Sequence, residues 1–341
     1  MKNTDLEPPG FFSLPQLIPN TSENRYFYKN GLSKLIPRLK LKVHSEIEDC
    51  FYLWDIFSPK QSLFDLWDFR YSWYEGYKYK PLFYTIYENK KPLAVLPLWF
   101  NLTKKRYEWF GSNWMEDNTF FVRDDHLIDL LYAVMPAPIH INAIISKNYL
   151  KNKLIFSQLK QDEPKNVKNI SQMHSLADLF ATLHKKSRYH LKADYSKIKA
   201  FNPRVNLVYS NDLSYFAKLY KMNTQRFAQN SEDESDLFEN KRKNTFINFI
   251  RNSGIYKTKF VEVYIQNYLA AIDLIIEYNN FYYAIRGGND INRFKGIGNF
   301  MVYVEFEDAI NNNFSILDCL QDDNGWKHRF FDRQPLYLFE K

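Results

Sequence analysis

Cysteine is scarce in this chain of 341 residues, and its two cysteines, Cys50 and Cys319, lie far apart. Such a pair offers neither a disulfide framework nor the spacing of a zinc site. The seven histidines form no H-E-x-x-H cluster, and we therefore expect no metal. No G-x-S-x-G elbow occurs, and neither cysteine has a histidine at a recognised spacing, so a covalent enzyme intermediate is not indicated.

Long apolar runs are also missing. The most apolar stretch, residues 127–145, is interrupted by Asp129, Pro136, Pro138 and His140. A membrane span needs about 20 predominantly apolar residues, which this stretch does not supply. Residues 1–16 lack the continuous apolar core of a signal peptide. We therefore expect no transmembrane segment and a cytoplasmic location.

Aromatic residues are abundant, with 25 Tyr and 29 Phe. Such residues favour half-buried pleated surfaces and so predict a large sheet component. An AT-rich genome would enrich the same residues and is an equally good explanation. The net charge of +7, from 46 basic and 39 acidic residues, suits anionic ligands such as nucleotides, CoA or tRNA without identifying one of them.

The length predicts about two domains. Polar residues without a clear period make residues 1–40 an expected N-terminal arm, and polar residues 161–175 an expected linker. The N-terminal lobe would then span 41–160 and the C-terminal lobe 176–341. Apolar periodicity predicts helices at 46–57, 63–77, 125–135, 176–199, 212–223, 241–252 and 299–312. It predicts strands at 82–87, 93–100, 106–110, 139–145, 259–266, 269–278, 281–287, 314–319 and 336–339.

The two halves repeat the same order of elements. Residues 92–98 (PLAVLPL) resemble residues 268–274 (YLAAIDL), and each is the second strand of a predicted hairpin, followed by a strand, a helix and a strand. A match this short can arise by chance, but the shared order favours duplication. We predict an α/β (α+β) fold of two similar lobes with mixed, mostly antiparallel sheets flanked by helices.

A glycine-rich basic loop follows the strand predicted at 281–287 and precedes a helix. Glycine lets backbone N–H groups approach a ligand, and a helix N-terminus binds phosphate. A pyrophosphate cradle is therefore our interpretation, although the third Rossmann glycine is absent. The alternative is that these glycines only cap a loop before the helix. The candidate cofactor-binding residues are Arg286, Arg293, Lys295, Gly296, Gly298 and Asn299.

Residues 318–327 (DCLQDDNGWK) resemble the D-L-G-x-G-[DE]-x-x-Y-K element of the GNAT-like acetyltransferase family linked to cellulose biosynthesis, which is related to the Fem peptidyltransferases. Asp318, Trp326 and Lys327 match at preserved spacing. Residues 185–192 resemble that family's basic K-x-R-x-x-L-[KR] helix entry, and the looser resemblance extends over about 46–332. Leu320 and Asp322 replace both glycines of the element, and this departure is the feature that supports a catalytically silent scaffold.

The resemblance implies acyl transfer. The acceptor must then lose a proton and the tetrahedral oxyanion must be stabilised. Asp318, Asp322 or Asp323 could take the proton, and Lys327 could stabilise the oxyanion. An Asp318–Lys327 ion pair that only orders the last turn explains the same spacing at least as well.

The predicted helix from residue 185 carries Lys185, Arg188 and Lys192 on one face. Such a stripe could meet phosphates of CoA or tRNA, although a solvated helix face is the commoner explanation. Arg188 and Trp326 are the candidates for substrate contact.

These features predict an acyltransferase that moves an acyl group from acyl-CoA, as co-substrate and most simply acetyl-CoA, to an amine or hydroxyl. By resemblance, the acceptor would be a sugar, an amino sugar or another envelope-related metabolite. A Fem-like transferase using aminoacyl-tRNA is the alternative enzyme, although no long coiled-coil arm is evident. A catalytically silent scaffold with the same fold is the third possibility.

Overall fold

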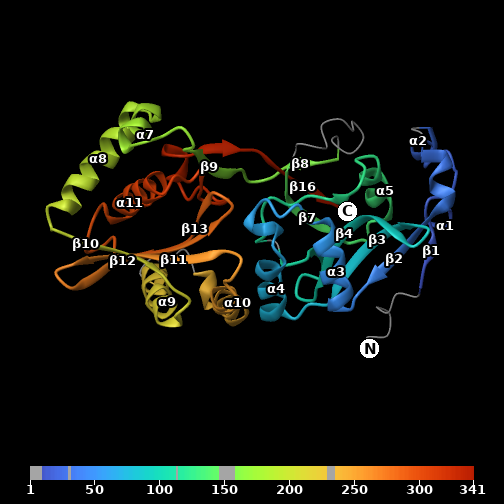
Figure 1. The fold of residues 1–341 in the computed structure, drawn as a ribbon, viewed down its shortest axis with the longest axis horizontal. Helices are drawn as coiled ribbons and strands as arrows, with labels where there is room; N and C mark the ends of the chain where they lie inside the picture. The colour runs from blue at the N-terminus through green and yellow to red at the C-terminus, as the bar shows by residue number, and fades with distance from the viewer. Residues whose placement is uncertain (1–9, 30–31, 113, 146–157, 229–234) are drawn as a thin grey trace.

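The computed structural model describes residues 10–29, 32–112, 114–145, 158–228 and 235–341. In it the chain forms two lobes side by side, each with a sheet flanked by helices (Figure 1). The predicted fold class is confirmed. None of the helices in the described ranges is both long and apolar enough to span a membrane.

The N-terminal lobe is built on an antiparallel sheet in the order β1-β2-β3-β4-β5, with β6 pairing to β4. Its strands are β1 (Phe12–Ser13), β2 (Leu39–His44), β3 (Pro81–Glu88), β4 (Lys91–Asn101), β5 (Arg106–Trp109) and β6 (Phe121–Val122). Its longer helices are α3 (Ile47–Phe57), α4 (Trp67–Tyr77) and α5 (Leu127–Val134). The arm expected at 1–40 contributes β1, part of β2, α1 (Leu14–Leu17) and α2 (Arg25–Lys29), while residues 1–9 lie outside the described ranges.

The C-terminal lobe has a sheet in the order β10-β11-β12-β13-β14-β9-β15. Its strands are β9 (Lys165–Asn169), β10 (Arg204–Tyr209), β11 (Lys257–Ile265), β12 (Tyr268–Tyr278), β13 (Phe281–Asn289), β14 (Ile316–Asp318) and β15 (Asp332–Gln334). Its helices are α7 (Leu176–Thr182), α8 (Lys185–Lys199), α9 (Leu213–Ala228), α10 (Asn240–Arg251) and α11 (Ile297–Asn311). Helices α7, α8 and α11 lie on one face of the sheet, and α9 and α10 lie on the other (Figure 1).

A small third sheet ties the end of the chain to its first half. It has the order β7-β16-β8, with β7 (His140–Ile145), β16 (Leu336–Glu340) and β8 (Lys160–Gln161). The C-terminal strand therefore pairs with a strand of the N-terminal half, and the chain crosses between the lobes twice. Two meanders, β3-β4-β5 and β11-β12-β13, confirm the predicted repeat of strand order.

Two local expectations differ from the structure. The helix predicted at 176–199 is broken after Thr182, because Leu183 is extended and His184 caps α8 by accepting from the Lys186 N–H. The polar stretch expected as a linker at 161–175 contains β9, where Lys165, Asn166 and Lys168 are buried. The division of the chain into 41–160 and 176–341 stays a prediction.

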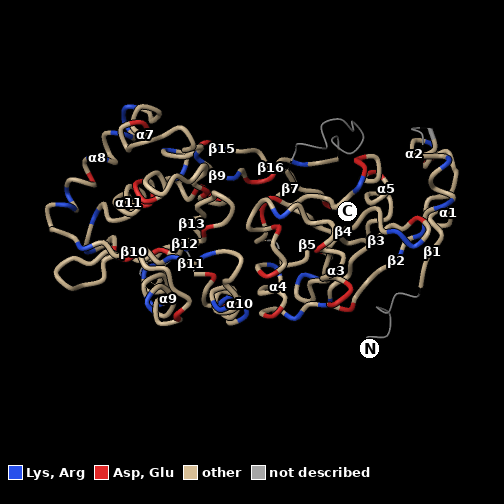
Figure 2. Tube along the Cα trace, viewed as in Figure 1, with Lys and Arg blue, Asp and Glu red and all other residues tan. Residues whose placement is uncertain are grey.

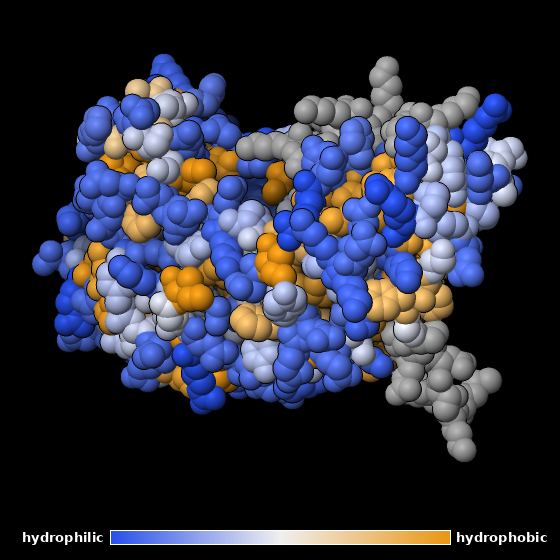
Figure 3. Space-filling model, turned by 45° about the vertical axis from the view of Figure 1, so that its right-hand side comes forward, coloured by the Kyte–Doolittle hydropathy of each residue, from blue (hydrophilic) through white to orange (hydrophobic). Residues whose placement is uncertain are grey.

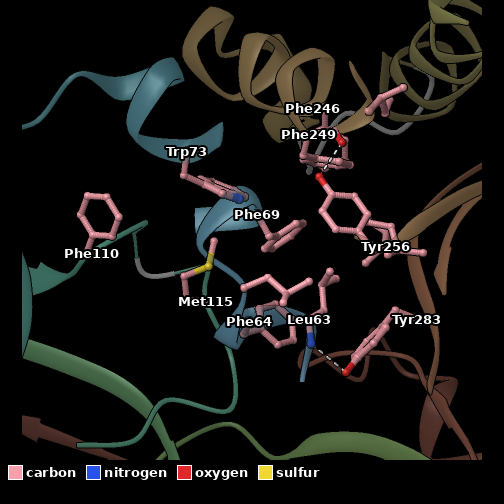
Figure 4. Close-up of a cluster of buried hydrophobic side chains, with 14 of the residues drawn as sticks. Leu63, Phe64, Phe69, Trp73, Phe110, Met115, Phe246, Phe249, Tyr256 and Tyr283 are labelled. Atoms are coloured by element: carbon pink, nitrogen blue, oxygen red, sulfur yellow. Dashed lines mark hydrogen bonds between the residues drawn. The ribbon is translucent and has the colours of Figure 1, made fainter. Parts of the chain in front are cut away.

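Aromatic side chains from both lobes fill the space between them (Figure 4). Phe69 of α4 lies 5.3 Å from Phe249 of α10 between ring centroids. The Leu63 N–H donates to the Tyr283 hydroxyl at 3.1 Å, which joins the 3-10 turn Leu63–Asp65, just before α4, to β13. The lobes thus share one hydrophobic core. On the face drawn in Figure 3, apolar residues lie in small patches among hydrophilic ones, which is ordinary for a folded surface.

Candidate functional site

The candidate site lies where the parallel strands β13 and β14 separate. They pair only through residues 281–283 and 316–318. Within the described ranges, no strand pairs with β13 on its β14 side from Ala284 to Asn289, and this stretch is called the free edge. Parallel strands end at the same edge of a sheet, so the segments that follow them lie close together. These segments are the loop to α11 and residues 319–326.

A β-bulge marks the start of the free edge. Leu274 of β12 pairs with Arg286, whereas the next residue, Ile275, pairs with Ala284, so Ile285 is the extra residue. A bulge leaves backbone groups outside the regular ladder and often lies beside an active site. On the helix side, the Asn223 amide donates to the Gly287 carbonyl at 2.7 Å. The Gly288 N–H also bonds the Asp273 carboxylate. The stretch from Ala284 to Asn289 therefore offers backbone groups, of which the Gly287 carbonyl and the Gly288 N–H are already bonded by side chains.

The N-terminus of α11 lies at the end of this edge. Gly296 is its N-cap residue with φ 98°, a left-handed conformation that glycine adopts without strain. A Cβ at Gly296 would lie 2.8 Å from Asp194 Oδ1. The Asn299 amide donates to Asp194 Oδ2 at 2.6 Å. A carboxylate from α8 thus lies where the sequence predicts a pyrophosphate.

The other predicted cofactor residues do not all gather there. Gly298 is open, since a Cβ there would meet only Asn289 Nδ2, at 3.9 Å. Arg293 is exposed with its guanidinium 4.3 Å from the Tyr268 ring centroid, and Lys295 is also exposed. Arg286 lies apart from the α11 N-terminus and forms an ion pair with Asp236 at 2.6 Å.

Asp318 is fully buried at the end of β14, and its ion-pair partner is Lys165 of β9, at 2.6 Å. Lys165 also contacts Asp117 at 2.5 Å and Glu116 at 3.7 Å, both from the N-terminal lobe. Although burial opposes it, these carboxylates raise the pKa of Lys165 well above its ordinary value, and burial raises the pKa of Glu116 to about 8. The expected Asp318–Lys327 ion pair is therefore wrong.

Lys327 instead holds the loop after β14. Its ammonium donates to the carbonyls of Cys319 at 2.6 Å and Gln321 at 2.5 Å. The thiol of Cys319 is buried, and burial raises its pKa to about 12. A thiol with so high a pKa is an inert structural group.

The two residues that replace glycines in this loop keep a glycine-like backbone. Leu320 has φ 63° and Asp322 has φ 59°. The loop thus follows the left-handed path that the resemblance implies, although a side chain there costs about 1–2 kcal/mol relative to glycine. Leu320 offsets part of this because its side chain is buried in the core between the lobes.

The remaining predicted residues lie around this loop or on α8. Asp322 is exposed, whereas Asp323 accepts from the His328 N–H at 2.9 Å and pairs with its ring at 2.6 Å. Trp326 is half-buried, 6.3 Å from Phe331 between ring centroids. Arg188 is half-buried in the first turn of α8, on the outer side of the lobe.

A pair of carboxyl groups that no motif in the sequence predicted lies beside the free edge. Asp273 of β12 lies opposite Gly287, and Glu305 lies on α11. The Glu305 carboxyl shares a hydrogen bond with the Asp273 carboxylate. An acidic residue in the otherwise apolar strand pattern around 273 was the available signal. Nowhere in the described ranges are three His, Cys, Asp or Glu residues grouped so that they could hold a metal ion.

No protein-family model and no curated protein matches this sequence. Solved structures do match. FemX is 11% identical with a TM-score of 0.55, over 88% of this chain and 97% of that chain. The C-terminal domain of a putative lysylphosphatidylglycerol synthetase from Agrobacterium fabrum is 10% identical with a TM-score of 0.54, over 86% of this chain and 91% of that chain.

A tandem GNAT protein from the clavulanic acid biosynthesis pathway is 8% identical with a TM-score of 0.51, over 89% of this chain and 98% of that chain. Identities this low show the fold alone. The likeness nonetheless extends over both lobes and nearly the full length of each neighbour. The chain therefore has a tandem GNAT-like fold.

Proposed function

We propose that this protein is an acyltransferase whose activated acyl group lies along the free edge of β13, between Ala284 and Asn289. The separation of β13 from β14 is the observation that carries this proposal. Backbone groups along an unpaired strand can bind an extended ligand as another strand would. N–H donors fixed by the bulge would also stabilise the oxyanion that forms when the acyl carbon is attacked. Transfer to an amine or a hydroxyl satisfies this geometry.

Acyl-CoA is the first candidate donor. The first turn of α11 offers N–H groups and the positive end of the helix dipole. Gly298 leaves room for close approach, and Arg293 and Lys295 are exposed nearby in sequence. A pyrophosphate would have to share this helix end with Asp194, which already accepts from Asn299. Acetyl-CoA is the simplest donor of this class.

Aminoacyl-tRNA is the second candidate, implied by the resemblance to the Fem peptidyltransferases. The carboxylate of Asp194 at the N-terminus of α11 favours aminoacyl-tRNA as the donor. This donor is an ester and has no pyrophosphate that would have to bind beside that carboxylate. Helix α8 carries six Lys and Arg residues and one acid, Asp194, which is turned toward α11. Figure 2 shows the basic positions spaced along α8 at the outer side of the lobe. Such a helix suits the phosphates of a nucleic acid.

The predicted catalytic roles of Asp318, Lys327, Asp322 and Asp323 stay proposals. The contacts of Asp318 and Lys327 support a positioning role, because both side chains are buried and fully occupied in holding the chain around 318–327. Asp322 is the exposed member of the set. A sugar or amino-sugar acceptor likewise remains what the family resemblance implies, and Trp326 and Arg188 remain its proposed contacts.

A thermal-shift panel should identify the donor. Acetyl-CoA, longer acyl-CoAs, free CoA and aminoacyl-tRNA are compared, and the true donor should raise the melting temperature in proportion to its binding. If CoA binds, Gly298→Asp should abolish its effect by placing a carboxylate among the N–H groups. Gly254→Asp is the matched control, since a side chain at Gly254 meets open space. A scaffold without activity would show no shift with any donor, and this result would refute the proposal.

A further inference from the structure

Strand β10 ends the C-terminal sheet on the side opposite β15. It pairs with β11 along residues 204–209 without a register shift, and in the described ranges no strand pairs with its other side, which is called the outer edge of β10. A sheet edge carries N–H and C=O groups that can pair with a strand of another chain. The outer edge of β10 is therefore a candidate interaction surface.

The backbone groups on this edge belong to every second residue. The Ser210 N–H donates to the Thr258 carbonyl at 3.2 Å, and these two residues directly continue the register of β10 with β11. Hydrogen-bonded and non-hydrogen-bonded pairs alternate along an antiparallel ladder, so Val205, Leu207 and Tyr209 point their N–H and C=O groups away from β11. Within the described ranges, these three residues form no other backbone hydrogen bond.

The same three residues expose apolar side chains. Val205 is 38% exposed, Leu207 is 45% exposed and Tyr209 is 54% exposed. Val205 and Leu207 lie opposite Val263 and Val261 of β11, which belong to the core beneath α7, α8 and α11. The exposed side chains thus continue this face of the sheet beyond its covered part. Adjacent apolar side chains on a protein surface often mark an interaction site.

Other edges of the two main sheets are protected. Edge strands are usually short, charged, bulged or interrupted by proline. Strand β15 has three residues, including Asp332 and Arg333, and β1 has only two residues. Strand β5 has four residues, including Arg106 and Glu108. Strand β10 has six residues with one charge, no proline and no bulge, so it lacks this protection.

We propose that β10 pairs antiparallel with β10 of a second copy of this chain, about a twofold axis at Leu207. Pairing of identical strands about such an axis is self-complementary and closes as a dimer. In this register Leu207 lies opposite Leu207 of the second copy, and Val205 lies opposite Tyr209. All three outward-pointing residues then form hydrogen-bonded pairs with residues that also point outward.

The side chains also suit this register. A β-branched residue opposite an aromatic residue, as in the pair of Val205 with Tyr209, is a favourable cross-strand combination. Arg204, the one charged residue of β10, would lie opposite Ser210, so no like charges meet within the strand pair. Two strands separate β10 from the free edge of β13, so the dimer does not depend on the proposed acyl transfer and leaves that edge accessible.

Analytical ultracentrifugation of the full chain tests the association. The wild-type protein should show a monomer–dimer equilibrium. Leu207→Lys places two like charges opposite each other at the axis and should raise the dissociation constant of the dimer by more than about tenfold. Leu102→Lys, at an exposed apolar position of the N-terminal lobe, is the matched control and should leave this constant unchanged. A wild-type protein that is monomeric at every concentration would overturn the proposal, and so would a Leu207→Lys protein that dimerises normally.

A mixture of two charge variants tests the register. Leu207→Lys and Leu207→Glu should each fail to dimerise alone, because each repels its own copy. In an equimolar mixture, opposite charges would face each other across the axis, so heterodimers should form. Circular dichroism and the melting temperature check that both variants are folded. Folded variants that form no heterodimer would show that Leu207 does not lie at the axis.

Residue-resolved amide exchange of the wild-type protein tests the backbone pairing without any substitution. In the dilute monomer, the outward N–H groups of Val205, Leu207 and Tyr209 should exchange fast, whereas those of Asn206 and Val208, which face β11, should exchange slowly. Above the dissociation constant of the dimer, the three outward amides should also become slow, because they are then hydrogen-bonded. A dimer in which these three amides still exchange fast would overturn the proposal.

Discussion

Replacing Lys165 by methionine should lower the free energy of unfolding by about 3–5 kcal/mol, the usual effect of removing one partner of a buried ion pair. Lys165 is 1% exposed and contacts Asp318 and Asp117 at 2.6 and 2.5 Å. Without its ammonium, two carboxylates from different lobes would be left in the interior with no cation between them. Urea denaturation at neutral pH measures the change.

Lys168→Met is the matched control, because Lys168 lies on the same strand and pairs at 3.2 Å with Asp332, whose side chain is 71% exposed. Such a pair contributes about 0–1 kcal/mol. Adding Asp318→Asn to Lys165→Met should recover part of the loss, because it removes one uncompensated charge. Equal losses in Lys165→Met and Lys168→Met would contradict the central role given to Lys165.

Replacing Gly76 by alanine should destabilise the protein by about 1–3 kcal/mol, the usual penalty for overpacking. In an exposed helix the same change stabilises by about 1 kcal/mol. The sign reverses here because a Cβ at Gly76 would lie 2.1 Å from Thr245 Oγ1 and 2.9 Å from the Lys241 carbonyl oxygen. Gly76 thus marks one point of close contact between α4 of one lobe and α10 of the other.

A second substitution separates the two contacts of this glycine. Thr245→Ala removes the hydroxyl, so the double variant should recover part of the loss, while the Lys241 carbonyl still obstructs the new methyl group. Gly254→Ala meets open space and should change stability little. A Gly76→Ala protein that melts above the wild type would mean that α4 and α10 do not pack this closely in solution.

The sequence predicted those elements whose apolar residues alternate in a regular way. The meander β11-β12-β13 and helix α11 lie close to their expected ranges, because apolar runs bounded by turns such as Asn279-Asn280 specify strands locally. Strand β9 escaped detection, since four of its five residues are Lys or Asn. Three of these, Lys165, Asn166 and Lys168, are buried through partners elsewhere in the chain, such as Asp117, 48 residues away. No local pattern reports partners at such distances in the sequence.

At the candidate site, too, the local segments were predictable from the sequence, whereas the partners of their side chains were not. The loop before α11 and the segment 318–327 were recognised from glycine and motif positions, and the structure places both after the ends of parallel strands. The partners within them were not predictable in the same way. Spacing suggested Lys327 for Asp318, whereas the partner is Lys165, and nothing near Gly296 in sequence indicates that Asp194 approaches it. Pairing across a fold depends on register and packing, which one sequence does not display.

Hydrogen exchange with bound donor tests the central claim most directly. Amides that bind an extended ligand, or lie beneath it, exchange more slowly than in the free protein. With saturating acetyl-CoA or aminoacyl-tRNA, whichever stabilises the fold, the account predicts slower exchange at residues 284–289 and at 297–299. Exchange in β3 and β4 of the N-terminal lobe should stay unchanged and serves as the internal control. A donor that binds while leaving 284–289 unprotected would contradict the account.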